Sequence, residues 1–270
     1  LDRIEALSAL NRRYGSVEEA LATLEARKKE LAHYEQIGFE KSKLQSELLN
    51  QDYQSSFAEN FKVKFIPYPI PPIGKVNAGI MTLSKSKISE ATRVQLPCPF
   101  KWPTRVANLK RCLSINRLPI EGSDKELVIV NLHLEAYDDG DGKKAQAEML
   151  RKYLQAEADK GNYVIAGGDF NQTFSGTDTS IIKQFNGTWK PPVLDTNKFD
   201  KSWQFLMDTK TASCRSLDKP LTSLNTNKFQ FYIIDGFIVS SNIEVTSLET
   251  KQMGFKNTDH NPVILKFKLK

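Results

Sequence analysis

The stretch Tyr163–Asn171 (YVIAGGDFN) decides how the rest of this chain is interpreted. Its first four residues form a short apolar run, which predicts a buried strand. Gly167 and Gly168 end that run, because paired glycines interrupt regular structure. Asp169 and Asn171 come directly after them, so polar side chains gather where the strand ends. Asx residues are also common in turns, so this segment alone does not separate a turn from a functional site.

Three other segments also place polar side chains at predicted strand ends: Asn131–Leu134 with His133, Ile234–Gly236 with Asp235, and Thr258–Pro262 with Asp259 and His260. Each has an ordinary structural explanation when it is taken separately. Together they supply imidazoles, which transfer protons near neutral pH, and carboxylates, which suit a hard cation such as Mg²⁺. Hydrolysis of a phosphate ester needs both groups. The combination therefore predicts metal-assisted phosphate chemistry.

The ordered set NLHLEAYDDG, GGDFNQTF, IIDGFIVS and TDHNP resembles the endonuclease/exonuclease/phosphatase superfamily over about residues 38–270. The resemblance implies an α/β fold of the DNase I type, a four-layer αββα sandwich with its site at one edge of two central sheets. It also implies hydrolysis of a phosphate ester with Mg²⁺ or Mn²⁺ as cofactor. Nucleic acid, an inositol phosphate and a phospholipid all stay open as substrates, and the basic charge of the chain slightly favours nucleic acid.

The resemblance also assigns roles to individual residues. Asp169 would activate the attacking water or help bind the metal, and Asn171 would orient that water or contact the phosphate. His260 would act as a base or stabilise the transition state, and Asp235 would hold its tautomer. A second group would complete the site, with Asp259 in the metal shell, His133 as acid or phosphate ligand, and Arg111 and Tyr137 on the phosphate.

One expected part of the family pattern is not found in the sequence. The family begins with a strand that ends in a metal-site Asn, and a second strand ends in Gln-Glu, whose Glu is the main metal ligand. The segment Gly38–Ser42 resembles the residues just after that Glu, and the nearest carboxylates are Glu35 and Glu40. Loss of a metal ligand weakens metal binding. Two hypotheses stay open: an impaired hydrolase, and a non-catalytic scaffold that binds DNA or protein.

Residues 1–36 have a different composition from the rest of the chain. They contain no Pro and one Gly, and their apolar residues recur at helical spacing. Gly15 suits a helix end, and Ser16 with Glu19 indicates a capping box that restarts a helix. The sequence predicts helices over about 1–14 and 17–36. This hairpin resembles the coiled-coil arm of SMC-like proteins such as RecN, and a natural fusion, an engineered chimera or a truncated gene would each produce it.

Residues 1–36 are therefore expected to form one domain, which mediates self-association, and residues 37–270 a second. Within the second domain, apolar patterning predicts one long helix over 145–158 and a short one over 180–185. Strands are expected over residues 61–66, 78–84, 111–118, 127–134, 163–166, 229–239, 243–250 and 263–269. This dominance of strands favours layered sheets over a doubly wound parallel sheet.

Composition excludes several classes of protein. With 270 residues, 40% hydrophobic and 26% charged, the chain is neither disordered, collagen-like nor a disulfide scaffold. The apolar runs are too short to span a membrane. Three cysteines without metal spacing favour free thiols in a reducing compartment, and hence the cytoplasm. The net charge of +6 makes an anionic partner plausible, although Lys and Arg are spread along the sequence and form no recognisable aromatic–basic stacking platform.

Overall fold

A computed structural model of the chain describes residues 15–16, 18–19, 21–25, 52–66, 74–102, 105, 108–136 and 140–270. The chain divides into two compact units, Leu1–Tyr53 and Gln54–Lys270. In the first unit, Gly15 has a φ of +84°, and the Ser16 Oγ accepts a hydrogen bond of 3.1 Å from the Glu19 amide. The predicted restart of a helix at Ser16 is confirmed. The rest of the expected hairpin, including Glu35, lies outside the described residues, and so does Glu40. The expected domain boundary between residues 36 and 37 therefore stays a prediction.

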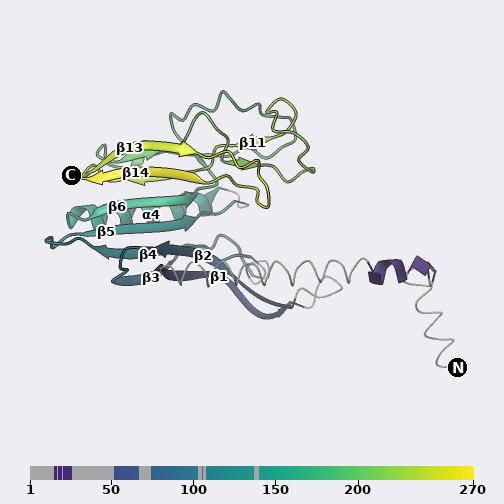
Figure 1. The fold of residues 1–270 in the computed structure, drawn as a ribbon, viewed down its shortest axis with the longest axis horizontal. Helices are drawn as coiled ribbons and strands as arrows, with labels where there is room; N and C mark the ends of the chain where they lie inside the picture. Colours follow the sequence, from purple (N-terminus) through teal and green to yellow (C-terminus); the bar gives the residue numbers. More distant parts are fainter. Residues whose placement is uncertain are drawn as a thin grey trace. The chain divides into compact units, whose positions relative to one another are not determined.

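The centre of the second unit is a six-stranded sheet with the order β3-β4-β5-β6-β12-β9 (Figure 1). All neighbouring strands are antiparallel except β5 and β6, which are parallel. The strand bounds are β3 Glu90–Gln95, β4 Cys112–Pro119, β5 Glu126–His133, β6 Tyr163–Asp169, β9 Gln204–Leu206 and β12 Asp235–Val239. A parallel pair needs a crossover connection, and helix α4 (Asp141–Asp159) supplies it.

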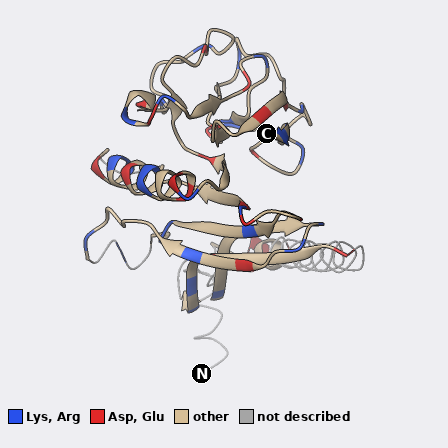
Figure 2. Cartoon of the chain, turned by 90° about the vertical axis from the view of Figure 1, so that its left-hand side faces the viewer, with Lys and Arg blue, Asp and Glu red and all other residues tan. Residues whose placement is uncertain are grey.

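Helix α4 covers one face of this sheet because its apolar residues recur at helical spacing. Leu150 and Leu154 are fully buried and pack with Val128 and Val130 of β5 and Val164 of β6 in one hydrophobic core. Lys, Arg, Asp and Glu are distributed along the helix (Figure 2). The main core therefore lies between α4 and the sheet.

Two hairpins lie against the opposite face of the sheet. The first pairs β1 (Gln54–Ile66) with β2 (Gly74–Ser84), and the Asn131 side chain of β5 donates a hydrogen bond of 2.9 Å to the Met81 carbonyl of β2. The second pairs β13 (Ile243–Thr250) with β14 (Val263–Leu269), and its residues pack with Ile165 in a second core. The fold is mixed α/β with a central sheet and few helices, as expected for a DNase I-like protein. Among the described residues there is no strand before Gln54 and no second helical layer.

Short elements complete the described part of the unit: β7 (Thr173–Phe174) with β8 (Val193–Leu194), β10 (Cys214–Arg215) with β11 (Phe231–Tyr232), and the 3₁₀ helix Thr196–Lys198. The predicted short helix over residues 180–185 is wrong, because this segment forms turns. The predicted strand 229–239 is divided into β11 and β12, and β3 was not predicted. All three cysteines are free thiols, and no helix among the described residues is long and apolar enough to cross a membrane.

Candidate active site

Three adjacent strands end side by side and carry the polar residues of the candidate site. Asp169, the last residue of β6, is in register with His133 of β5 on one side and with Asp235 of β12 on the other. Side chains in register on neighbouring strands point to the same face of a sheet. His260 reaches the same place from the loop before β14, where it forms an isolated bridge with Cys214. The four residues Asp169, His133, Asp235 and His260 are called the strand-end site below.

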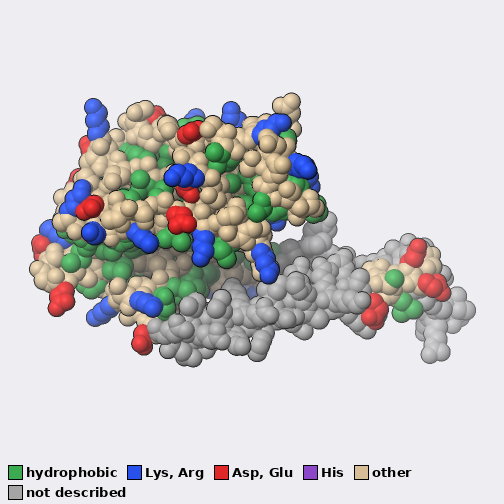
Figure 3. Space-filling model, turned by 45° about the horizontal axis from the view of Figure 1, so that its top comes forward, with side chains coloured by type: hydrophobic (Ala, Val, Ile, Leu, Met, Phe, Trp, Pro, Cys, Tyr) green, Lys and Arg blue, Asp and Glu red, His purple; other side chains and the backbone are tan. Residues whose placement is uncertain are grey.

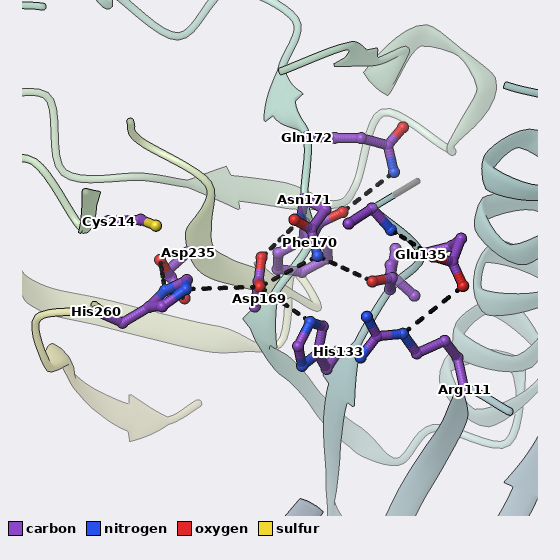
Figure 4. Close-up of polar contacts among 12 residues, drawn as sticks. Arg111, His133, Glu135, Asp169, Phe170, Asn171, Gln172, Cys214, Asp235 and His260 are labelled. Carbon is purple, nitrogen blue, oxygen red and sulfur yellow. Dashed lines mark hydrogen bonds and ion pairs between the residues drawn. The ribbon is translucent and has the colours of Figure 1, made fainter. Parts of the chain in front are cut away.

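Asp169 lies between the two imidazoles (Figure 4). Its Oδ2 is 3.2 Å from the His133 Nε2 and 3.9 Å from the His260 Nε2. The other ring nitrogen of His260, Nδ1, is 2.9 Å from the Asp235 Oδ2. The Asp235 carboxylate therefore fixes the orientation of His260 and leaves its Nε2 directed toward Asp169.

Two neighbours of Asp169 in sequence fix the position of its carboxylate. The Asn171 amide donates a hydrogen bond of 2.7 Å to the Asp169 Oδ1, and the Asn171 side chain donates one of 3.0 Å to the Leu134 carbonyl. Gly168 has a φ of +143°, and a Cβ there would lie 2.0 Å from the Leu132 carbonyl oxygen. Only glycine satisfies both constraints, which explains the glycine directly before Asp169.

The surroundings of Asp169 favour its protonated form. Its side chain is only 12% exposed. Burial, together with the nearby Asp235 carboxylate, raises the pKa of Asp169 to about 7. A carboxylate with a pKa near neutrality is a stronger base than an ordinary surface Asp. Such shifts are typical of functional sites.

The two histidines of the strand-end site carry different charges. Burial alone would lower the pKa of His260, but its contacts with Asp235 and Cys214 raise it to about 11. Burial and the charge of Arg111 lower the pKa of His133 to about 3. At neutral pH His260 is therefore a cation and His133 is a neutral imidazole. The site thus combines a poised base with one fixed positive charge.

Three further residues that the resemblance assigns to the site, Arg111, Asp259 and Tyr137, are not seen in contact with Asp169. Arg111 is buried, and its Nε lies 3.8 Å from the Glu135 carboxylate. Contact between Arg111 and a substrate phosphate therefore stays a prediction. Asp259 is half-buried, and its carboxylate has no ion pair with a described residue. Tyr137 lies outside the described residues.

A divalent cation prefers several oxygen ligands, and the described residues do not provide such a set. No group of three His, Cys, Asp or Glu side chains in the described ranges is placed to share a metal ion. Asp169 already contacts His133 and Asn171, and Asp235 contacts His260. These residues alone do not fit a complete Mg²⁺ or Mn²⁺ site.

Two residues near the site were missed by the sequence analysis. Cys214 pairs with His260 through an isolated backbone bridge, and burial raises the pKa of its thiol. Glu135 is buried beside Arg111. Cys214 lies in none of the quoted motifs, whereas Glu135 belongs to NLHLEAYDDG but was given no role there. Both contacts join segments far apart in the chain. The sequence signal for Glu135 was a charged residue two positions after His133, just beyond the end of β5.

Comparison with solved structures places this geometry in a known fold. The chain is similar to an endonuclease/exonuclease/phosphatase from Beutenbergia cavernae, with 15% identity and a TM-score of 0.55 over 84% of this chain and 57% of that one. It is also similar to the human Nocturnin catalytic domain with bound sulfate, with 17% identity and a TM-score of 0.53 over 84% of this chain and 76% of that one. A third similar structure is ANGEL2, a 2′,3′-cyclic phosphatase, with 14% identity and a TM-score of 0.54 over 84% of this chain and 77% of that one.

These similarities show the fold and no more, because the identities are low. The chain spans little more than half of the Beutenbergia protein. No family model matches the sequence, and no curated protein matches it. The chain therefore has the fold of these endonuclease/exonuclease/phosphatase structures.

Proposed function

We propose that this chain hydrolyses phosphate esters at the strand-end site. The observation that carries the proposal is the position of Asp169, whose carboxylate lies 3.2 Å from a neutral His133 and 3.9 Å from a cationic His260. A base beside a fixed positive charge suits attack of water on phosphorus. The shared fold of Nocturnin and ANGEL2 supports the same class of reaction.

In the proposed reaction, Asp169 removes a proton from water as its oxygen attacks phosphorus. The raised pKa of Asp169, about 7, makes this transfer favourable near neutral pH. The His260 imidazolium then stabilises the negative charge that develops on the phosphate oxygens. The leaving oxygen takes a proton from the protonated Asp169 or from solvent. His133 contacts Asp169 throughout and holds its carboxylate in place.

A requirement for Mg²⁺ or Mn²⁺, implied by the family resemblance, remains part of the proposal. Asp169 and Asp259 are the ligands that the resemblance suggests, and a cation would need further ligands beyond them. Hydrolysis should therefore be measured with Mg²⁺, with Mn²⁺ and with a chelator. A rate that depends on the cation would indicate that further oxygen ligands, beyond Asp169 and Asp259, complete the site.

The test uses bis(p-nitrophenyl) phosphate and p-nitrophenyl phosphate as a diester and a monoester. Asp169→Asn should reduce turnover by at least about 10²-fold, since it removes the general base. The matched control is Asp200→Asn, because Asp200 accepts the same type of hydrogen bond, 2.8 Å from the Ser202 amide, in an exposed turn. Equal rates for the two variants would contradict the proposal. Binding of phosphate without turnover would favour the alternative of a non-catalytic scaffold.

A further inference from the structure

A concave site lies at the same edge of the sheet as the strand-end site. It is a hollow of about 620 Å³ between β1, β3 and the segment that precedes β4. Its charged lining consists of four cations and one carboxylate, Lys62, Arg93, Arg105, Lys110 and Glu59, and its aromatic lining of Phe61 and Trp102. It is called the basic hollow below. On the face of the molecule shown in Figure 3, basic and acidic side chains are interspersed.

Arg93 is held in the basic hollow by neutral acceptors. Its Nε donates a hydrogen bond of 2.7 Å to the Glu59 carbonyl, and its Nη2 donates one of 2.7 Å to the Gln95 side chain. Among the described residues, the Glu59 carboxylate forms an ion pair only with Lys62, at 2.8 Å. The Arg93 guanidinium is therefore fixed in orientation while its charge remains without a paired carboxylate in the described part of the chain. A positioned, uncompensated arginine favours binding of phosphate.

Arg105 and Lys110 add two further positive charges to the lining of the basic hollow. The same two residues also line an adjoining hollow of about 400 Å³ that reaches Met149 of α4. The cations thus lie along a path between two concavities, which suits an extended polyanion better than a single phosphate.

Trp102 supplies the second chemical feature of the basic hollow. Its side chain is 82% exposed, which is unusual for the largest aromatic residue. An exposed indole beside cations is the combination on which unpaired bases stack in single-stranded nucleic acid complexes. Base pairs in a duplex stack on each other, so a duplex offers this surface no free base face.

The basic hollow and the strand-end site lie along one edge of the sheet. Gln95, at the end of β3, is in register with Cys112 at the start of β4, and β5 ends beside β4 at His133. Strand β3 is three positions from β6 in the sheet, or about 14 Å at the usual strand spacing. A ligand that fills both sites must therefore carry more than one phosphate.

We propose that the basic hollow binds single-stranded nucleic acid beside the phosphate that is hydrolysed at the strand-end site. This inference rests on the proposed function for the reaction at Asp169. Its own content is the substrate class: an oligonucleotide whose phosphates contact Arg93, Arg105 and Lys110 and whose base stacks on Trp102.

Binding is tested by fluorescence anisotropy with a labelled 12-nucleotide single strand. The full chain carries Asp169→Asn in every sample, so that hydrolysis does not interfere. Trp102→Ala should weaken binding by about 5- to 150-fold, and Trp102→Phe should restore most of it. The variant Arg105→Gln/Lys110→Gln should reduce the slope of log K against log salt by about 1.4. The matched double variant Lys201→Gln/Lys266→Gln, which removes two exposed charges elsewhere, should change neither binding nor slope.

Two further ligands separate stacking from charge. A single strand of equal length without bases, and inorganic polyphosphate, should both bind more weakly than the normal strand and should not respond to Trp102→Ala. A duplex of equal length should also bind more weakly. Equal affinity for the normal and the abasic strand would overturn this inference. Equal losses of binding affinity in the two double variants would also overturn it. Hydrolysis of the small p-nitrophenyl esters tests the proposed function separately, since those esters do not reach the basic hollow.

Discussion

Replacing Asp235 by Asn removes the anion that keeps His260 protonated. The substitution preserves shape and leaves an oxygen that still accepts a hydrogen bond, so the Nδ1 contact of 2.9 Å is retained in geometry. The charge, however, is lost. The contact with Cys214 still favours the cation, but burial opposes it, so the pKa of His260 should fall from about 11 toward its ordinary value of 6.5. A complete return to 6.5, a pKa change of about 4.5, corresponds to about 6 kcal/mol in the free energy of protonating this imidazole.

NMR titration of the imidazole Cε1 protons measures this change. The chain has three histidines, and His260→Gln identifies the signal of His260. In the unsubstituted protein the His260 signal should stay that of a cation up to pH 9. In Asp235→Asn it should titrate below pH 7, and Asp200→Asn should leave it unchanged. A His260 signal that titrates above pH 8 in Asp235→Asn would refute the assignment of Asp235 as its counter-ion.

The same contact predicts how stability depends on pH. The folded-state pKa of His260, about 11, lies above its unfolded value of 6.5. The stabilisation is therefore complete below pH 6.5 and is lost as the pH rises toward 11. Asp235→Asn should accordingly lose most stability at pH 6 and little near pH 11, as measured by urea unfolding. Equal losses at the two pH values would indicate that Asp235 stabilises the fold by other contacts.

Three further predictions concern the same strand ends. His133 should titrate near pH 3 by NMR, and its neutral form should stabilise the fold above pH 6.5 and cease to do so as the pH falls toward 3. Asp169→Asn should raise the free energy of unfolding by up to about 4 kcal/mol at pH 8 but not at pH 3, because ionised Asp169 is unfavourable in the fold. Gly168→Ala should lower the free energy of unfolding, measured in urea, by more than about 3 kcal/mol, since a Cβ would lie 2.0 Å from a carbonyl oxygen. Gly176→Ala should lower it by about 1 kcal/mol, because this residue has a φ of +84° but no atom lies within 4 Å of the added Cβ. The first prediction is contradicted if stability stays constant between pH 6.5 and pH 3 and falls only below pH 3. The second is contradicted if Asp169→Asn leaves the dependence of unfolding free energy on pH unchanged. The third is contradicted if the two glycine variants lose equal amounts of unfolding free energy.

The sequence predicted most of the central sheet because its strands carry dense apolar patterns. The segments expected over 111–118 and 127–134 correspond to β4 and β5 with shifts of one residue at each end. Strand β3 was missed because Glu90–Gln95 (EATRVQ) is mostly polar and exposed, and pairing with β4 sets its conformation. The short helix expected over 180–185 failed because local contacts form turns instead, such as the Asp178 carboxylate accepting a hydrogen bond of 2.8 Å from the Ser180 amide.

The candidate site was predictable only in part, for a physical reason. Asp169, Asp235 and His260 occur in motifs, and the structure brings them together because neighbouring strands place their ends in register. Burial cannot be read from a motif, so the pairing of Arg111 with Glu135 was not foreseen. The basic hollow was missed for a similar reason. Its cations come from three separate segments, and the sequence shows them only as scattered charges.

The most direct test of the account is the rate of phosphate-ester hydrolysis at pH 6 and at pH 8. With a pKa of about 7, Asp169 is about one-tenth ionised at pH 6 and nine-tenths at pH 8, so a reaction that uses it as base should accelerate about tenfold. Asp169→Asn should show neither the rate nor its pH dependence. Hydrolysis that is equally fast at both pH values and survives in Asp169→Asn would contradict the central claim, as would the absence of hydrolysis under every cation condition.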